Sequence, residues 1–228
     1  MSSRVVFEAW LAEIAQIQSL KGLYLRESRI TNAGLAHLAK LTSLEELALG
    51  QGRMTNAGLA HLAKLRSLRY LMLSGKNFTD AGMVHLKSIP SLRILHAGHL
   101  PHLTDAALVH IAQVKTLENL SLHWVEAITV NKGRVGDPLH DYDLICLAKL
   151  TSLKDLQVGH TGITDEALLY LEQLPTISIL DILEGANFSP AGVQRFRRNM
   201  PDLVIFRPNL RAVMKQPSRQ RPVPTPRK

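Results

Sequence analysis

Hydrophobic residues change their spacing at regular intervals along this chain. In residues 43–49 (SLEELAL), Leu47 and Leu49 flank Ala48, and this period of two is typical of a short β-strand. In residues 31–41 (TNAGLAHLAKL), leucines recur every three positions and so share one face of a short helix. The pattern therefore predicts short strands that alternate with short helices.

The same two segments recur along most of the chain. The helical segment at 31–41 returns letter for letter at 55–65. Related helical segments lie at 79–89, 104–114, 140–150, 164–174 and 189–199. The strand segment recurs at 19–25, 43–49, 67–73, 91–97, 116–122, 152–158 and 176–182, with a degenerate copy at 202–208. A repeat of about 24 residues predicts a stacked architecture, because one copy cannot bury its apolar face alone.

Polar residues mark where each helix begins. A threonine precedes the helical segments, where a hydroxyl can cap the helix N-terminus; these are Thr31, Thr55, Thr79, Thr104 and Thr164. Asp80, Asp105 and Asp165 follow directly, at the positive end of the helix dipole. The Gly34 position becomes Ala107 and Ala167 in later copies, so we expect it to need a small side chain for close packing.

The LxxLxL strand followed by a Thr-Asn/Asp-Ala-Gly-Leu helix resembles leucine-rich repeat proteins. The resemblance covers about residues 5–206 and is strongest to the strand–helix, ribonuclease-inhibitor-like variety with short repeats seen in bacterial proteins. It implies an α/β solenoid in which parallel strands line a concave face and short helices cover the convex face. The usual ninth-position Asn is replaced, so backbone bonds or Thr/Ser hydroxyls must hold the loops; the replacements are Ser28, Gly52, Lys76 and Thr161.

The repeat divides the chain into three parts. We expect an N-terminal capping helix in residues 1–18, the solenoid in 19–206, and a disordered tail in 207–228. The solenoid is interrupted near 123–139 by about 12 extra residues that read as a small hairpin around Gly133. An insertion in a regular solenoid often lies at a binding face, although a tolerated surface loop remains the alternative.

The side chains between the leucines predict the composition of the concave face. Tyr70, Met72 and Ile94 are expected to form an exposed apolar patch, and small residues in the next column leave it open. An apolar centre with a polar rim is typical of a protein-binding surface; the alternative is a solvated sheet face. The predicted partner-binding residues are Tyr70, Met72, Ile94, His96, Asn119, Ser121, His123, Trp124, Asp155 and Gln157.

Charge is concentrated in the C-terminal tail. The 228 residues carry a formal net charge of +8, but 207–228 hold seven basic residues, five prolines and no acid. The remaining 20 basic and 19 acidic residues nearly balance. The tail is read as a solvated terminus, as a weak, salt-sensitive contact for nucleic acid or an acidic partner, or as a lipid-surface contact.

Other chemistry finds little support in the sequence. His96, His99 and His102 form HxxHxxH, and with His123, His160 and Asp155 they offer metal ligands, yet they divide between strand and loop, so a polar rim is favoured. The histidine column at 37, 61, 85 and 110 continues with Cys146, Tyr170 and Arg195; its positions lie about 10 Å apart, too far to share a zinc ion. We expect no cofactor, no metal and no enzymatic activity, a hydrolase using His96 and His123 being least favoured.

The single cysteine excludes an intrachain disulfide, and no apolar run approaches the length of a membrane span. We therefore expect a monomeric, cytoplasmic protein-interaction module whose partner the sequence does not identify. The alternative is an electrostatic nucleic-acid-associated protein that acts through the basic tail.

Overall fold

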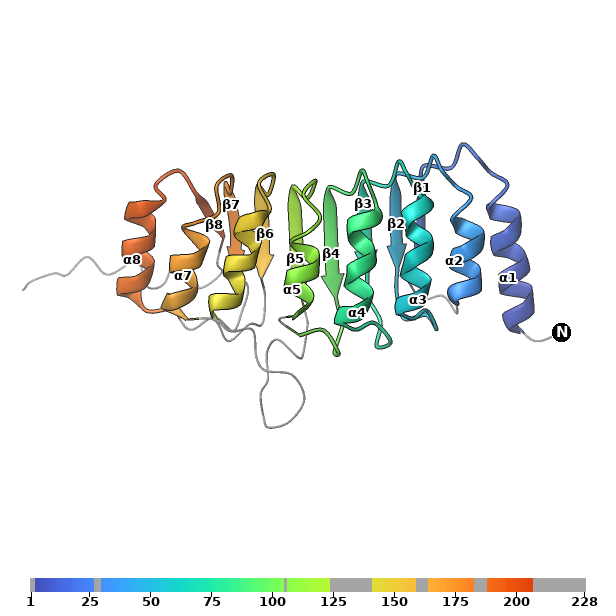
Figure 1. Ribbon diagram of the computed structural model, residues 1–228, viewed down its shortest axis with the longest axis horizontal. Helices are drawn as coiled ribbons and strands as arrows, with labels where there is room; N and C mark the ends of the chain where they lie inside the picture. The colour runs from blue at the N-terminus through green and yellow to red at the C-terminus, as the bar shows by residue number, and fades with distance from the viewer. Residues whose placement is uncertain are drawn as a thin grey trace, which may run out of the picture.

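The computed structural model describes residues 3–26, 30–104, 106–123, 141–158, 164–182 and 188–206. Within these residues the chain forms one sheet of eight parallel strands in sequence order. Figure 1 shows the strands in one layer and the helices in a second layer that covers one face of the sheet. The strands are β1 (Gly22–Leu25), β2 (Glu46–Leu49), β3 (Tyr70–Leu73), β4 (Ile94–Gly98), β5 (Asn119–His123), β6 (Asp155–Val158), β7 (Ile179–Ile182) and β8 (Val204–Phe206). The predicted leucine-rich repeat architecture is confirmed.

The helices between the strands are short, and several finish as 3₁₀-helix. In the repeat at 55–65 one turn of α-helix continues as 3₁₀-helix, whose tighter turn suits a segment that must return within a few residues. The helical elements are α1 (Ser3–Ile14), α2 (Asn32–Leu38), α3 (Asn56–Leu59), η1 (Ala60–Lys64), α4 (Asp80–Met83), η2 (Val84–Ser88), α5 (Ala106–Ile111), η3 (Asp141–Lys149), α7 (Asp165–Leu171) and α8 (Pro190–Asn199). No described helix is long and apolar enough to cross a membrane.

The core lies between the two layers and consists mainly of leucine. In the repeat that contains β2, the side chains of Leu35, Leu38, Leu41, Leu44 and Leu47 are completely buried. Equivalent leucines from neighbouring repeats join them in one continuous cluster. At the N-terminal end, α1 places Leu11 in this core while Trp10 stays half exposed. Each repeat therefore depends on its neighbours to complete its core.

Side chains at the helix N-termini link consecutive repeats. Asn32 accepts the backbone N–H of Thr55 on its Oδ1 (2.9 Å) and donates from Nδ2 to the Thr55 hydroxyl (2.9 Å). Asp80 accepts both the N–H and the hydroxyl of Thr104 (2.7 Å each). Asn56 binds Thr79, and Asp165 binds Ser189, in the same two ways. The acids after the threonines therefore bind the next repeat, which the helix-dipole argument did not predict.

The identity of this linking residue decides whether the next threonine caps its own helix. Thr104 binds a carboxylate, and its hydroxyl also accepts the Ala106 N–H (3.2 Å). Thr55 and Thr79 bind amides and make no side-chain cap. A carboxylate only accepts, so the threonine hydroxyl donates to it and keeps both oxygen lone pairs for the helix N–H groups, whereas an amide N–H occupies one of them. The predicted N-cap position is thus confirmed at Thr31, Thr55, Thr79 and Thr164. The hydroxyl binds the helix N-terminus at Thr31, Thr104 and Thr164, and this hydrogen bond is absent at Thr55 and Thr79.

The small-residue column follows from the same contacts. A Cβ on Gly58 would lie 2.4 Å from Asn32 Oδ1, and one on Gly82 would lie 2.4 Å from Asn56 Oδ1. Neither glycine has a positive φ. Close packing against the linking side chain of the preceding repeat therefore explains these glycines, as the sequence predicted.

Backbone hydrogen bonds hold the loops that lack the usual asparagine. The Arg53 N–H donates to Ile30 O (2.7 Å), and the Gly75 N–H donates to His99 O (3.1 Å). The expectation that backbone bonds serve there is confirmed for these loops. Ser28, Asp105, Thr161, the insertion from 124 to 139 and the tail from 207 lie outside the described residues.

A candidate binding surface on the open face of the sheet

Two rows of side chains cross the face of the sheet that the helices leave uncovered, here called the concave face. Parallel pairing without a register shift places equivalent residues of successive strands side by side, as predicted. The first row is Gly22, Glu46, Tyr70, Ile94, Asn119, Asp155 and Ile179. The central row is Tyr24, Ala48, Met72, His96, Ser121, Gln157 and Asp181.

The middle of this face is apolar. Tyr70, Met72 and Ile94 come from adjacent strands and are each half-buried. Their remaining exposed surface forms a patch over β3 and β4. An apolar patch of this kind, surrounded by polar side chains, is the arrangement from which protein-binding surfaces are built.

Small residues in the central row are covered by their larger neighbours. Ala48 is completely buried between Tyr24 and Met72, and Ser121 is only 3% exposed between His96 and Gln157. Adjacent strands lie about 4.8 Å apart, so long side chains overhang a short one. Ser121, predicted as a contact residue, therefore offers a partner little surface of its own.

Tyr70 and His96 contact each other at the edge of the patch. Their rings pack edge to face with centroids 5.1 Å apart and an interplanar angle of 70°. The Tyr70 hydroxyl lies 3.4 Å from His96 Nδ1. Burial raises the pKa of Tyr70, so its hydroxyl stays neutral as a hydrogen-bonding group at the edge of the patch.

The two ends of the patch differ in character. Towards the N-terminus, the Tyr24 hydroxyl donates to Glu46, and this hydrogen bond raises the pKa of Tyr24. Towards the C-terminus, Asn119 Nδ2 donates to Asp155 Oδ2 (3.2 Å), while the buried Asp155 Oδ1 has no partner among the described residues. The C-terminal end of the patch is therefore polar, in contrast to its apolar centre.

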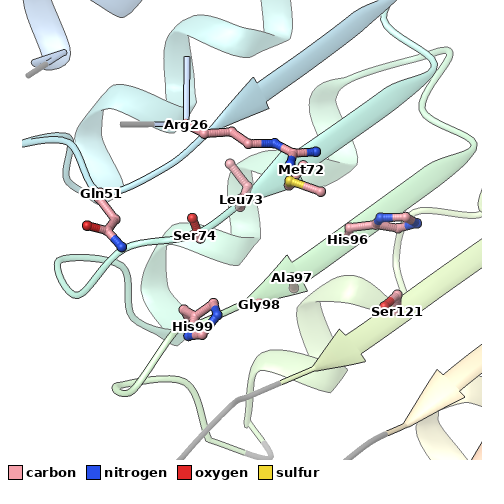
Figure 2. A pocket seen from close by; sticks show the side chains of 10 residues that line it. All are labelled: Arg26, Gln51, Met72, Leu73, Ser74, His96, Ala97, Gly98, His99 and Ser121. Atoms are coloured by element: carbon pink, nitrogen blue, oxygen red, sulfur yellow. The ribbon is translucent and has the colours of Figure 1, made fainter. Parts of the chain in front are cut away.

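A pocket of about 300 Å³ opens beside the patch. Its lining comes from several repeats (Figure 2) and comprises Arg26, Gln51, Met72, Leu73, Ser74, His96, Ala97, Gly98, His99 and Ser121. The small residues Ser74 and Gly98 leave room for it; they belong to the column that was predicted to leave the patch open. Gly50, in the same column, must be glycine for a different reason: a Cβ there would lie 2.3 Å from the Arg26 carbonyl oxygen.

The partner-binding residues predicted from the sequence include Met72, His96 and Ser121 of this lining but not the other seven: Arg26, Gln51, Leu73, Ser74, Ala97, Gly98 and His99. Arg26 directly follows β1 and His99 directly follows β4, whereas Gln51 is separated from the end of β2 by Gly50. Their position in the turn that follows each strand was the available signal. Of the predicted set, His123 is the last residue of β5, its side chain lies outside the description, and Trp124 lies outside the described residues altogether.

The histidines form no recognisable metal centre in the described part of the chain. No group of three or more His, Cys, Asp or Glu side chains there could hold a metal ion. His96 lies on β4, and His102 pairs with Thr79 in an isolated bridge beyond it. His37, His61, His85 and His110 lie half-buried on successive helical segments. His160 is outside the described residues.

Comparison with known proteins agrees with this architecture. Residues 149–171 match a family model described as leucine-rich repeat. No curated protein matches the sequence significantly. Among solved structures, the chain is similar to internalin C2 from Listeria monocytogenes, with 22% identity, a TM-score of 0.56, and coverage of 85% of this chain and 74% of that one.

Two further structures share the fold. An internalin (inlF) from Listeria monocytogenes is 18% identical, with a TM-score of 0.53 over 85% of this chain and 62% of that one. A leucine-rich repeat protein from Leptospira interrogans is 22% identical, with a TM-score of 0.50 over 86% of this chain. The chain spans half the length of the Leptospira protein. One repeat thus matches the leucine-rich repeat family model, and the whole sheet shares the fold of these leucine-rich repeat structures.

Proposed function

We propose that this chain is a non-enzymatic interaction module that binds a partner protein on its concave face. The contact surface is centred on Tyr70, Met72, Ile94 and His96, with Asn119, Asp155 and Gln157 on its C-terminal side. Solenoids of this kind use their extended concave surfaces for binding.

The observation that carries the proposal is the half-buried apolar patch of Tyr70, Met72 and Ile94 on the uncovered face of the sheet. The leucines that build the fold point away from this face and are buried between the layers. The patch side chains therefore add little to the core, and a partner that covers them would remove apolar surface from water.

Site-specific photo-crosslinking tests this proposal. A photoreactive amino acid at Ile94 should crosslink one partner protein in native extract, and the same amino acid at Val109 should not. Val109 is a matched control because it is also apolar and 47% exposed, but it lies on helix α5. Equal crosslinking from both positions would contradict binding on the concave face.

The partner identified in this way allows a quantitative test. Tyr70→Ala should weaken its binding by about 2 kcal/mol, since central aromatic residues dominate such interfaces, and Val109→Ala should leave the affinity unchanged. Trp124→Ala is expected to act like Tyr70→Ala if the insertion contributes to the same surface. Wild-type affinity in Tyr70→Ala and Ile94→Ala would exclude the patch as the contact.

A further inference from the structure

The pocket beside the patch has a chemistry of its own. We propose that it receives a segment of the partner protein in which an aliphatic or methionine side chain lies next to a carboxylate. This inference rests on the proposed function and specifies what part of a partner the concave face recognises.

The floor of the pocket is apolar and adaptable. Met72 lines it with a half-buried side chain, and Leu73, Ala97 and Gly98 line it mainly with backbone, because the side chains of Leu73 and Ala97 are buried in the core. Met72 is half-buried, and its flexible thioether side chain can adjust to the shape of an inserted apolar group. A volume of about 300 Å³ accommodates one such side chain with part of its backbone.

The rim of the pocket favours an anion. Arg26, His96 and His99 line it, whereas no aspartate or glutamate does. The Arg26 side chain extends over the sheet towards Met72 (Figure 2), and it is exposed. In the described part of the chain no carboxylate forms an ion pair with Arg26. A guanidinium presents paired N–H donors that match the two oxygens of a carboxylate.

The backbone at the rim supports a functional role for two of these side chains. Gln51 has a φ of 42° and His99 a φ of 52°, while the equivalent position in the repeat between them is Gly75, with a φ of 140°. A positive φ is unfavourable for residues with a Cβ and costs glycine little. Glycine would satisfy the backbone conformation of this turn in all three repeats. Two of the repeats nevertheless carry a polar side chain there, and both side chains line the pocket. Such strain is commonly retained at functional sites.

A carboxylate-bearing peptide suits these features better than a phosphate group. The rim offers one permanently charged side chain, Arg26, and the floor is apolar. A dianionic phosphate would need several cations to offset its desolvation, and it would leave the apolar floor unused. A partner segment that combines one carboxylate with one apolar side chain matches both halves of the pocket.

Peptide selection on the full chain tests this inference. The probe is a displayed library of random 12-residue peptides selected on the immobilised chain, and the enriched peptides are then synthesised for affinity measurements. We expect aspartate or glutamate within two positions of leucine, isoleucine or methionine. Arg26→Gln and Met72→Ala should each weaken these peptides about tenfold. The matched control Arg197→Gln removes an exposed arginine of α8 and should leave affinity unchanged.

Two further variants separate recognition from folding. Replacing the peptide carboxylate by its amide should cost the wild type about tenfold and cost Arg26→Gln much less. His99→Gly should leave the melting temperature unchanged or raise it, because it relieves a positive φ, while weakening the peptides about fivefold. A merely structural role for His99 predicts no loss of affinity.

The outcomes distinguish this inference from the proposed function. Peptides that lose affinity with Tyr70→Ala but not with Arg26→Gln would overturn the inference and leave the concave face as the binding surface. Peptides insensitive to all of these variants would overturn both. Enrichment of lysine or arginine beside the apolar residue, or a selection without any binder, would also refute the inference.

Discussion

The side chain of Asp80 carries the clearest prediction about stability. It joins two repeats by accepting the backbone N–H and the hydroxyl of Thr104 at 2.7 Å each. Asp80→Ala leaves both donors half-buried without their protein acceptor. A hydrogen bond to a charged group contributes about 1.5–3 kcal/mol when buried, and partial access of water reduces this. We expect a loss of about 2–3 kcal/mol in the free energy of unfolding.

Asp80→Asn is the matched control, because the chain already uses asparagine at this place. Asn32 and Asn56 bind Thr55 and Thr79 with one amide oxygen and one amide nitrogen. The asparagine variant should therefore keep the link to the next repeat and lose mainly the helix cap of the following threonine. The expected cost is about 1 kcal/mol or less.

Urea unfolding followed by circular dichroism measures both variants. For a chain of this size, about 1 kcal/mol corresponds to a shift of roughly 2–4 °C in melting temperature, so thermal unfolding provides an independent value. An unchanged slope of free energy against urea would show that stability alone has changed. Equal destabilisation by Asp80→Ala and Asp80→Asn, or an alanine effect below about 0.5 kcal/mol, would refute the role of the inter-repeat hydrogen bonds.

Three further outcomes are expected. Gly50→Ala should destabilise the fold by about 2–3 kcal/mol in urea unfolding, because its Cβ would lie 2.3 Å from the Arg26 carbonyl oxygen; full stability would show that this loop can yield. Hydrogen bonds from Lys154 and then Arg93 lower the pKa of Glu118. Their contribution to the free energy of unfolding is therefore present above the unfolded pKa of about 4.5 and is lost as the pH falls through the lower folded value. Glu118→Gln should remove this part of the acid dependence, which is worth less than about 1 kcal/mol at an exposed site. Burial raises the pKa of Tyr70 above 10.0. In an alkaline titration, Tyr70→Phe should therefore remove phenolate absorbance that develops at a pH above that of an ordinary tyrosine. Loss of absorbance only at lower pH would contradict the burial.

Much of the fold could be predicted because the repeat encodes it locally. Each copy carries its own short strand, such as Leu47, Ala48 and Leu49 in residues 43–49, and its own short helix. The copies stack because one copy cannot bury its apolar face alone. A constant repeat frame sets the register, which is why Tyr70, Met72 and Ile94 were predicted on one face and are found there. The apolar centre of the candidate site thus follows from the sequence.

The tertiary structure alone decided how neighbouring repeats touch. Whether Thr55 or Thr104 caps its helix depends on the amide or carboxylate that reaches it from the preceding repeat. Whether Ala48 is accessible depends on the size of the side chains on the adjacent strands. These are contacts between residues about 24 positions apart, and no local pattern describes them.

The pocket could not be predicted from the sequence for the same reason. Its rim combines Arg26, Gln51 and His99, which come from the turns after β1, β2 and β4, and Gln51 and His99 adopt a positive φ that the hydrophobic spacing does not predict. Hydrophobic spacing determines which face of a strand a residue occupies. Which side chains of different repeats converge on one cavity is set by backbone angles in the turns and by side-chain volume, and these exist only in the folded stack.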